Sequence, residues 1–132
     1  MEEGTRLVLD ASFILAFLLP DEDIAEVEET FKKFHQKEIQ LLSSALLPFE
    51  VFNCLKTALL RKRIEFKLAS GLGEKFLQLD IKLEEVDFTE SFKLSQKANL
   101  SFYDASYVYL ARSKVVPLLT LDVRMKHLAQ SA

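Results

Sequence analysis

Cysteine is nearly absent from the sequence, which holds Cys54 alone in 132 residues. A lone cysteine excludes a framework of disulfides within the chain and fits a protein of a reducing compartment. The two histidines and this one cysteine do not form the spacing of a zinc site either. We therefore expect a single domain over residues 1–132 that relies on its hydrophobic core, to which 49% of the residues can contribute.

Long hydrophobic runs are also missing. No apolar stretch approaches the roughly 20 residues that a membrane-spanning helix needs. The N-terminus carries Glu2 and Glu3 where a signal peptide would carry basic residues. We expect a soluble, cytoplasmic protein without a membrane partner.

An excess of positive charge is lacking as well, since the net charge is −3 and the isoelectric point is about 5.4. This balance argues against a protein whose main task is electrostatic binding to a nucleic-acid backbone. A metal-dependent nuclease remains compatible with it, because such an enzyme needs a cluster of acids. Basic residues gather in one region, where they either meet phosphates or form a solvated helix end that suits the helix dipole: Lys56, Arg61, Lys62, Arg63 and Lys67.

Apolar runs of strand length alternate along the chain with segments of helical periodicity. This alternation predicts a parallel sheet covered by helices on both faces, with right-handed crossovers. The expected strands cover residues 7–9, 39–42, 81–86 and 117–121. The expected helices cover residues 12–19, 24–35, 45–61, 66–79, 88–98, 101–113 and 122–129.

Individual residues refine these boundaries. Pro20 should stop the first helix, and Ser43 and Ser44 should cap the helix of residues 45–61. Gly71 and Gly73 are unfavourable inside a helix, so residues 66–79 could accommodate a bend.

Two aspartates directly follow expected strands. Asp10 ends the run of residues 7–9, and Asp122 ends the run of residues 117–121. The carboxyl ends of parallel strands form the edge where ligands bind in open α/β sheets, so both carboxylates should lie at one edge. The simpler alternative for each aspartate is an N-cap of the helix that follows.

Two further acids are candidates for the same edge. Ser101 and Asp104 have the spacing of a capping box, a role that is compatible with a place in a site. Glu50 lies among apolar neighbours in a helix, where an ionised carboxylate is costly to bury unless it is paired or bound to metal. Its alternative is a helix-edge residue that reaches solvent.

If these four carboxylates converge, their repulsion raises their pKa values and favours a bound cation. Oxygen ligands without His or Cys favour Mg²⁺ or Mn²⁺ over zinc. Such a site suits hydrolysis of a phosphodiester. Ser12 and Thr120 are candidates for binding a water or orienting a carboxylate, with turn capping as the alternative.

The residues that carry these predictions also resemble a known family. They are Leu7-Val8-Leu9-Asp10-Ala11-Ser12, the helical Glu50, Tyr103-Asp104-Ala105 and Leu119-Thr120-Leu121-Asp122. In this order and spacing they resemble the motifs of the PIN domain, in the VapC-like branch of type II toxin–antitoxin ribonucleases. The resemblance covers nearly the whole chain, including the break at Arg63-Ile64.

The resemblance implies a three-layer α/β/α sandwich with a central parallel sheet of four or five strands. It implies an endoribonuclease with a Mg²⁺ or Mn²⁺ site, in which Asp10, Glu50 and Asp104 match the most essential acids and Asp122 matches a more variable fourth. It also implies a homodimer and a cognate antitoxin whose tail occupies the active-site groove. Family members commonly add a strand after the last helix, whereas this sequence stops at Ala132, so the fifth strand is left open.

Two other functions compete with this one. A phosphatase could form an aspartyl-phosphate on Asp10, although Ser12 stands where that class has a second aspartate. A catalytically silent PIN-like domain could bind protein or RNA, although no surface role requires the intact acid set.

Aromatic residues suggest an interaction surface. Phenylalanine accounts for 11 of 132 residues, so we expect some to be exposed in a dimer interface or an antitoxin groove while most pack in the core. We interpret Tyr103 and Tyr107 as packing residues rather than a platform for stacking. The phenylalanines considered for the groove are Phe13, Phe17, Phe31, Phe34, Phe49 and Phe52.

Overall fold

The computed structural model describes residues 5–19 and 23–130. Within these residues four strands form one sheet in the order β3-β2-β1-β4, and every neighbouring pair is parallel. The strands are β1 (Thr5–Leu9), β2 (Ile39–Ser44), β3 (Lys82–Glu84) and β4 (Leu118–Leu119). The helices are α1 (Ala11–Leu18), α2 (Ala25–His35), α3 (Leu47–Leu60), α4 (Phe66–Gln78), α5 (Phe88–Ala98), α6 (Phe102–Lys114) and α7 (Val123–Gln130).

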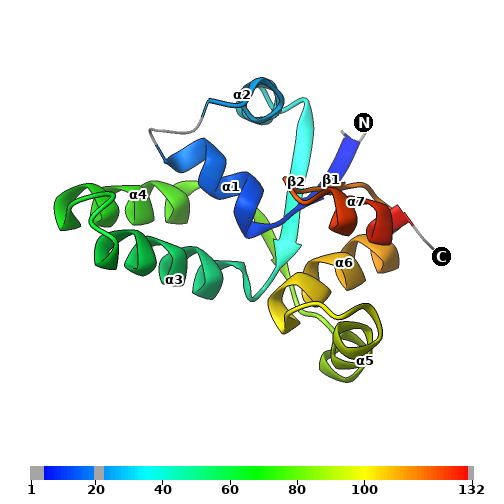
Figure 1. Cartoon of the computed structure of the whole chain (residues 1–132). Coiled ribbons are helices and arrows are strands. Elements are labelled where there is room, and N and C mark those ends of the chain that lie inside the picture. Colours follow the sequence, from blue (N-terminus) through cyan, green and yellow to red (C-terminus); the bar gives the residue numbers. More distant parts are fainter. Residues whose placement is uncertain (1–4, 20–22, 131–132) are drawn as a thin grey trace.

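Helices cover the sheet on both faces. On one side α1 contacts α2 and α3, and α3 pairs with α4; on the other side α6 contacts β1, β2 and β4 and packs against α5 and α7. Figure 1 shows the α3–α4 pair extending to the left of the sheet, while α5, α6 and α7 lie to the right. The predicted α/β/α sandwich with a parallel sheet is confirmed.

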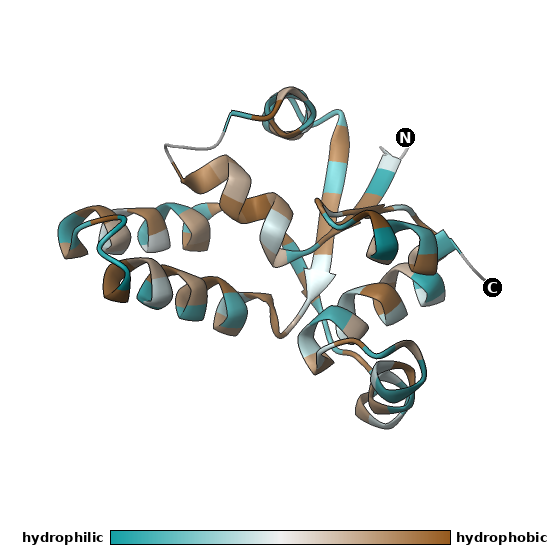
Figure 2. Ribbon diagram, viewed as in Figure 1, coloured by the Kyte–Doolittle hydropathy of each residue, from teal (hydrophilic) through white to brown (hydrophobic). Residues whose placement is uncertain are grey.

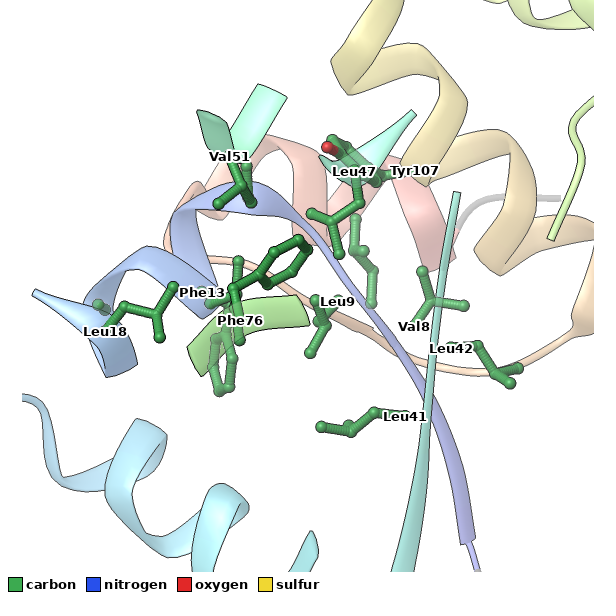
Figure 3. Packing of buried hydrophobic residues seen from close by; sticks show 14 of the residues in the cluster. Val8, Leu9, Phe13, Leu18, Leu41, Leu42, Leu47, Val51, Phe76 and Tyr107 are labelled. Carbon is green, nitrogen blue, oxygen red and sulfur yellow. The ribbon is translucent and has the colours of Figure 1, made fainter. Parts of the chain in front are cut away.

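The core follows from the pairing of the two central strands. β1 aligns Leu7 with Leu41 and Val8 with Leu42, and these runs are apolar because both faces of the sheet are covered. Helix α1 packs its Phe13 into this core, as Figure 3 shows, and its ribbon is almost wholly hydrophobic in Figure 2. A carboxylate placed at the junction of β1 and α1 is therefore surrounded by buried structure.

Two of the predicted strands are shorter than expected. The run of residues 81–86 contributes only Lys82–Glu84, and the run of residues 117–121 contributes only Leu118–Leu119. Both strands lie at the edges of the sheet, where pairing on one side alone limits their length. Helix α5 has the predicted bounds.

The expectation about capping is wrong, and the glycines of the fourth helix do not interrupt it. Ser43 and Ser44 belong to β2, because Ser43 pairs with Leu83 and Ser44 with Glu84, and α3 begins only after Leu46. Helix α4 continues through both glycines. At Gly73 an added Cβ would lie 2.6 Å from the Phe52 ring, so the missing side chain lets α3 approach α4 closely.

The phenylalanines divide between core and surface as expected. Phe31 is buried and stacks against Phe17 with ring centroids 4.0 Å apart. Phe49 is 69% exposed and Phe52 is 41% exposed. The structure does not test whether a dimer or antitoxin covers them.

The predicted stop at Pro20 lies outside the described residues. The fifth strand, which the family resemblance left open, is not seen among the described residues, which contain four strands and do not include the last two residues of the chain. None of the described helices is long and apolar enough to cross a membrane.

Candidate active site

Asp10 lies at the carboxyl end of β1 and starts α1. Its backbone N–H donates to Leu119 of β4, and its side chain accepts from the Phe13 N–H as the N-cap of the helix. The carboxylate is only 3% exposed. Asp10 therefore caps α1 and also lies at the predicted site, because the strand ends where the helix begins.

Two hydroxyls fix this buried carboxylate. Ser12 Oγ donates to Asp10 Oδ1 over 2.7 Å, and Thr120 Oγ1 donates to Asp10 Oδ2 over 2.5 Å. The Ser12 hydroxyl also accepts from the Leu121 N–H over 3.1 Å. Ser12 and Thr120 therefore orient Asp10 and tie the β1–α1 junction to the chain after β4.

Asp122 repeats the arrangement of Asp10 at the start of α7. Its backbone N–H donates to Thr120 Oγ1 over 3.0 Å, and its side chain accepts from the Met125 N–H over 3.1 Å. Unlike Asp10, Asp122 is exposed. Thr120 contacts both aspartates, so the two strand ends are joined at one edge of the sheet.

Glu50 reaches the same region from the first turn of α3. Pro48 occupies the beginning of that helix, where its missing N–H has no cost. The Tyr107 hydroxyl, on α6, donates to Glu50 Oε1 over 2.7 Å. Tyr107 is fully buried and appears among the core residues in Figure 3, so this bond fixes a half-buried carboxylate to a rigid helix.

Asp104 occupies the first turn of α6. Ser101 is the N-cap of that helix and accepts from the Asp104 N–H over 3.0 Å, which is the serine half of the predicted capping box. Two residues after Asp104, the Ser106 hydroxyl donates to Ser44 at the end of β2 over 3.0 Å. This bond attaches the start of α6 to the edge of the sheet.

The four predicted acids form one electrostatic cluster in which Asp104 is the common member. Burial is the main cause that raises the pKa of Asp10, and the charge of Asp104 adds to it. The hydrogen bonds from Thr120, Ser12 and the Phe13 N–H lower this pKa but do not cancel the rise. Burial likewise raises the pKa of Glu50, followed by the charges of Asp104 and Asp10. Burial also raises the pKa of Asp104, and the charge of Asp122 adds to it.

The donor chemistry of this cluster fits a hard divalent cation, since all four side chains offer carboxylate oxygens. Their mutual repulsion is the kind that a bound cation relieves. Among the described residues, however, no three Asp, Glu, His or Cys side chains already stand in an arrangement that could hold a metal ion. The roles of these four acids as ligands stay a prediction.

One residue of this region was not predicted from the sequence. Tyr107 was expected to serve packing alone, yet it binds Glu50 directly. Its spacing was the available signal, because residues three apart on a helix share a face, and Tyr107 follows Asp104 by three.

The sequence model of the PIN domain family matches residues 7–130. Ribonuclease VapC3 of Pyrobaculum aerophilum is 28% identical over 117 residues, which cover 89% of this chain and 89% of that protein.

Two solved structures have a similar fold. The crystal structure of PAE2754 from Pyrobaculum aerophilum has a TM-score of 0.72 at 24% identity and covers 97% of this chain and 87% of its own. VapC20 of Mycobacterium tuberculosis, a toxin that cleaves the sarcin–ricin loop, has a TM-score of 0.64 at 17% identity over 92% of this chain and 93% of its own. At these identities the two structures support the fold.

Proposed function

The chain belongs to the PIN domain family, and on this premise we propose that it is a metal-dependent endoribonuclease that hydrolyses RNA phosphodiesters. The observation that carries the proposal is the coupling of Asp104 to Asp10, Glu50 and Asp122 at one edge of the sheet. These four acids lie at the starts of four different helices, and no shared structural task requires their charges to meet.

Asp10, Glu50, Asp104 and Asp122 would hold Mg²⁺ or Mn²⁺. When bound, the ion lowers the pKa of a coordinated water and stabilises charge on the leaving oxygen. Binding requires the side chains to draw together from their present positions, since they have no metal-holding arrangement yet. Asp10 already has both oxygens engaged, but Oδ2 accepts one bond only and retains a lone pair for a ligand.

The other residues of the site position these carboxylates. Ser12 and Thr120 keep Asp10 oriented, and Tyr107 holds Glu50 through Oε1 and leaves Oε2 for a ligand or a water.

The likeness to Ribonuclease VapC3 supports a more specific role. We propose a VapC-like toxin of a type II toxin–antitoxin pair that acts in the cytoplasm, with RNA as substrate, a cognate antitoxin as inhibitor and a homodimer as the working form. The exposed Phe49 and Phe52 are candidates for the surface that the antitoxin or the second subunit of the homodimer would cover.

The test combines metal binding with RNA cleavage. Calorimetry with Mg²⁺ and with Mn²⁺ and cleavage of a mixed-sequence single-stranded RNA are measured on the native chain, on Asp104→Asn and on Asp87→Asn. Asp87 is an aspartate at the start of another helix, α5, and lies outside the cluster, so Asp87→Asn is the control for losing one carboxylate charge. We expect Asp104→Asn to lose binding and cleavage and Asp87→Asn to keep both.

Unchanged cleavage in folded Asp104→Asn would overturn the proposal. RNA binding without cleavage by the native chain in either metal would favour a silent PIN-like binding module instead.

A further inference from the structure

A groove between α1 and α3 leads away from the acidic edge. It has a volume of about 330 Å³ and begins at Ser12 and Leu121, which adjoin Asp10 and Asp122. Its far end is lined by Arg61 and Arg63, just beyond the end of α3. The groove therefore joins the acids to the basic region of the sequence.

The lining between these ends is mixed. The apolar part consists of Leu15, Ala16, Leu19 and Ala58, and the polar part of Cys54 and Thr57. Apolar walls with a few polar groups suit the flat face of a nucleobase, and an arginine suits a phosphate because its planar guanidinium forms two parallel hydrogen bonds.

The separation between the acids and the far end of the groove is that of a chain of nucleotides rather than a single one. Glu50 lies in the first turn of α3 and Arg61 caps its other end, so the two are separated by about 16 Å along the axis at 1.5 Å per residue. A phosphate at Arg61 is thus a different phosphate from the one at the acids.

We propose that this groove is a substrate subsite that holds the RNA strand beside the scissile phosphate, with Arg61 binding a backbone phosphate at its far end. The inference rests on the proposed ribonuclease function and extends it to the path of the substrate. It also divides the basic cluster, because Arg61 and Arg63 line the groove, whereas Lys56 lines a separate hollow between α3 and α4.

The experiment measures RNA binding separately from cleavage. In the Asp104→Asn background, where RNA stays intact, the affinity for a short labelled single-stranded RNA is compared between Arg61→Gln and Lys62→Gln over a series of salt concentrations. Lys62 is the matched control because it is the next residue, is exposed and does not line the groove. A dinucleotide, too short to reach from the acids to Arg61, is titrated in parallel.

Arg61→Gln should weaken binding of the longer RNA about tenfold. It should also reduce the slope of log affinity against log salt by about 0.7, the value of one lost phosphate contact on a single strand. The dinucleotide should bind both variants alike, and Lys62→Gln should stay close to the background protein with the longer RNA.

Equal effects of the two substitutions, or no effect of either, would overturn the subsite and leave the nuclease proposal intact. If the native chain binds RNA but never cleaves it, the nuclease proposal fails, and the difference between Arg61→Gln and Lys62→Gln still decides the subsite. No binding of RNA by any form would overturn both.

Discussion

The Tyr107 hydroxyl and Glu50 Oε1 are 2.7 Å apart although 57 residues separate them in the chain. The bond joins α6 to α3 across the acidic edge. Burial raises the pKa of Tyr107, and the Glu50 charge adds to this, so the hydroxyl keeps its proton and always acts as the donor. The bond therefore orients Glu50 whenever its carboxylate is ionised.

Replacing Tyr107 with Phe should lower metal affinity or cleavage by about 10- to 100-fold, the usual effect of losing a group that orients a ligand. The ring is kept, so the core should remain packed. Calorimetry with Mn²⁺ and the pH profile of cleavage measure the effect, since the Glu50 pKa should rise without the bond that lowers it. Tyr109→Phe, on the same helix, is the control and should leave both measurements unchanged.

Replacing Thr120 with Val should destabilise the fold by about 1–3 kcal/mol, because the change removes the donor to buried Asp10 and leaves the Asp122 N–H without its acceptor. Chemical denaturation measures this loss, and Thr120→Ser should recover most of it. Thr30→Val is the control, since the Thr30 hydroxyl makes a solvent-exposed bond to the Glu26 carbonyl. A loss of stability in Thr120→Val no larger than in Thr30→Val would contradict a structural role for the hydrogen bonds of Thr120 to Asp10 and Asp122.

The two glycines of α4 should respond differently to alanine. At Gly71 an added Cβ meets no atom within 4 Å, so Gly71→Ala should stabilise the protein by about 0.5–1 kcal/mol through helix propensity. At Gly73 the Phe52 ring must move away, so Gly73→Ala should gain less or lose stability. Thermal unfolding of the two variants side by side tests the close approach of α3 and α4.

Stability of the metal-free protein should depend on pH through the acidic cluster. Burial and neighbouring charges raise the pKa values of Asp10, Glu50 and Asp104 above 3.8, 4.5 and 3.8. A raised carboxyl pKa contributes stability that is full below the unfolded value and is lost as the pH rises through the folded value.

Asp104→Asn removes one of these groups and its effect on two others. The melting temperature of the variant relative to the native chain should therefore increase from pH 3.8 upward in a chelating buffer. Excess Mn²⁺ should reverse the order near neutral pH, because only the native chain gains stability from the ion. A difference that does not vary with pH would contradict the electrostatic cluster.

Much of the fold could be predicted from local patterns, and the errors have local causes. The bounds of α5 were predicted from its helical pattern, and the structure adds Asp87 as its cap. Ser43 and Ser44 looked like caps because hydroxyls before a helix usually are, but pairing with β3 extended β2 over both residues. The edge strands were predicted too long because apolar alternation reports burial and does not show where pairing ends.

Asp10 and Asp122 could be predicted to lie at one edge because each directly follows an expected strand of the parallel sheet, whereas Glu50 was singled out by its apolar neighbours and Asp104 by its capping box. Tyr107 could not be singled out, since its partner comes from another helix and its own pattern is that of a core residue. The groove was equally hidden, because Arg61 and Lys62 are neighbours in the sequence and only the packing of α1 on α3 separates their roles.

Asp10 and Asp122 each begin a helix with the carboxylate that the proposed site requires. Asparagine caps a helix as well as aspartate does, whereas alanine leaves the first turn uncapped. A descendant that gave up cleavage but still needed the scaffold would thus retain asparagine at these two positions rather than an arbitrary residue. Among related sequences, asparagine at both positions would mark a domain that lost cleavage but kept its fold, whereas arbitrary residues there would mark a sequence under no constraint on either.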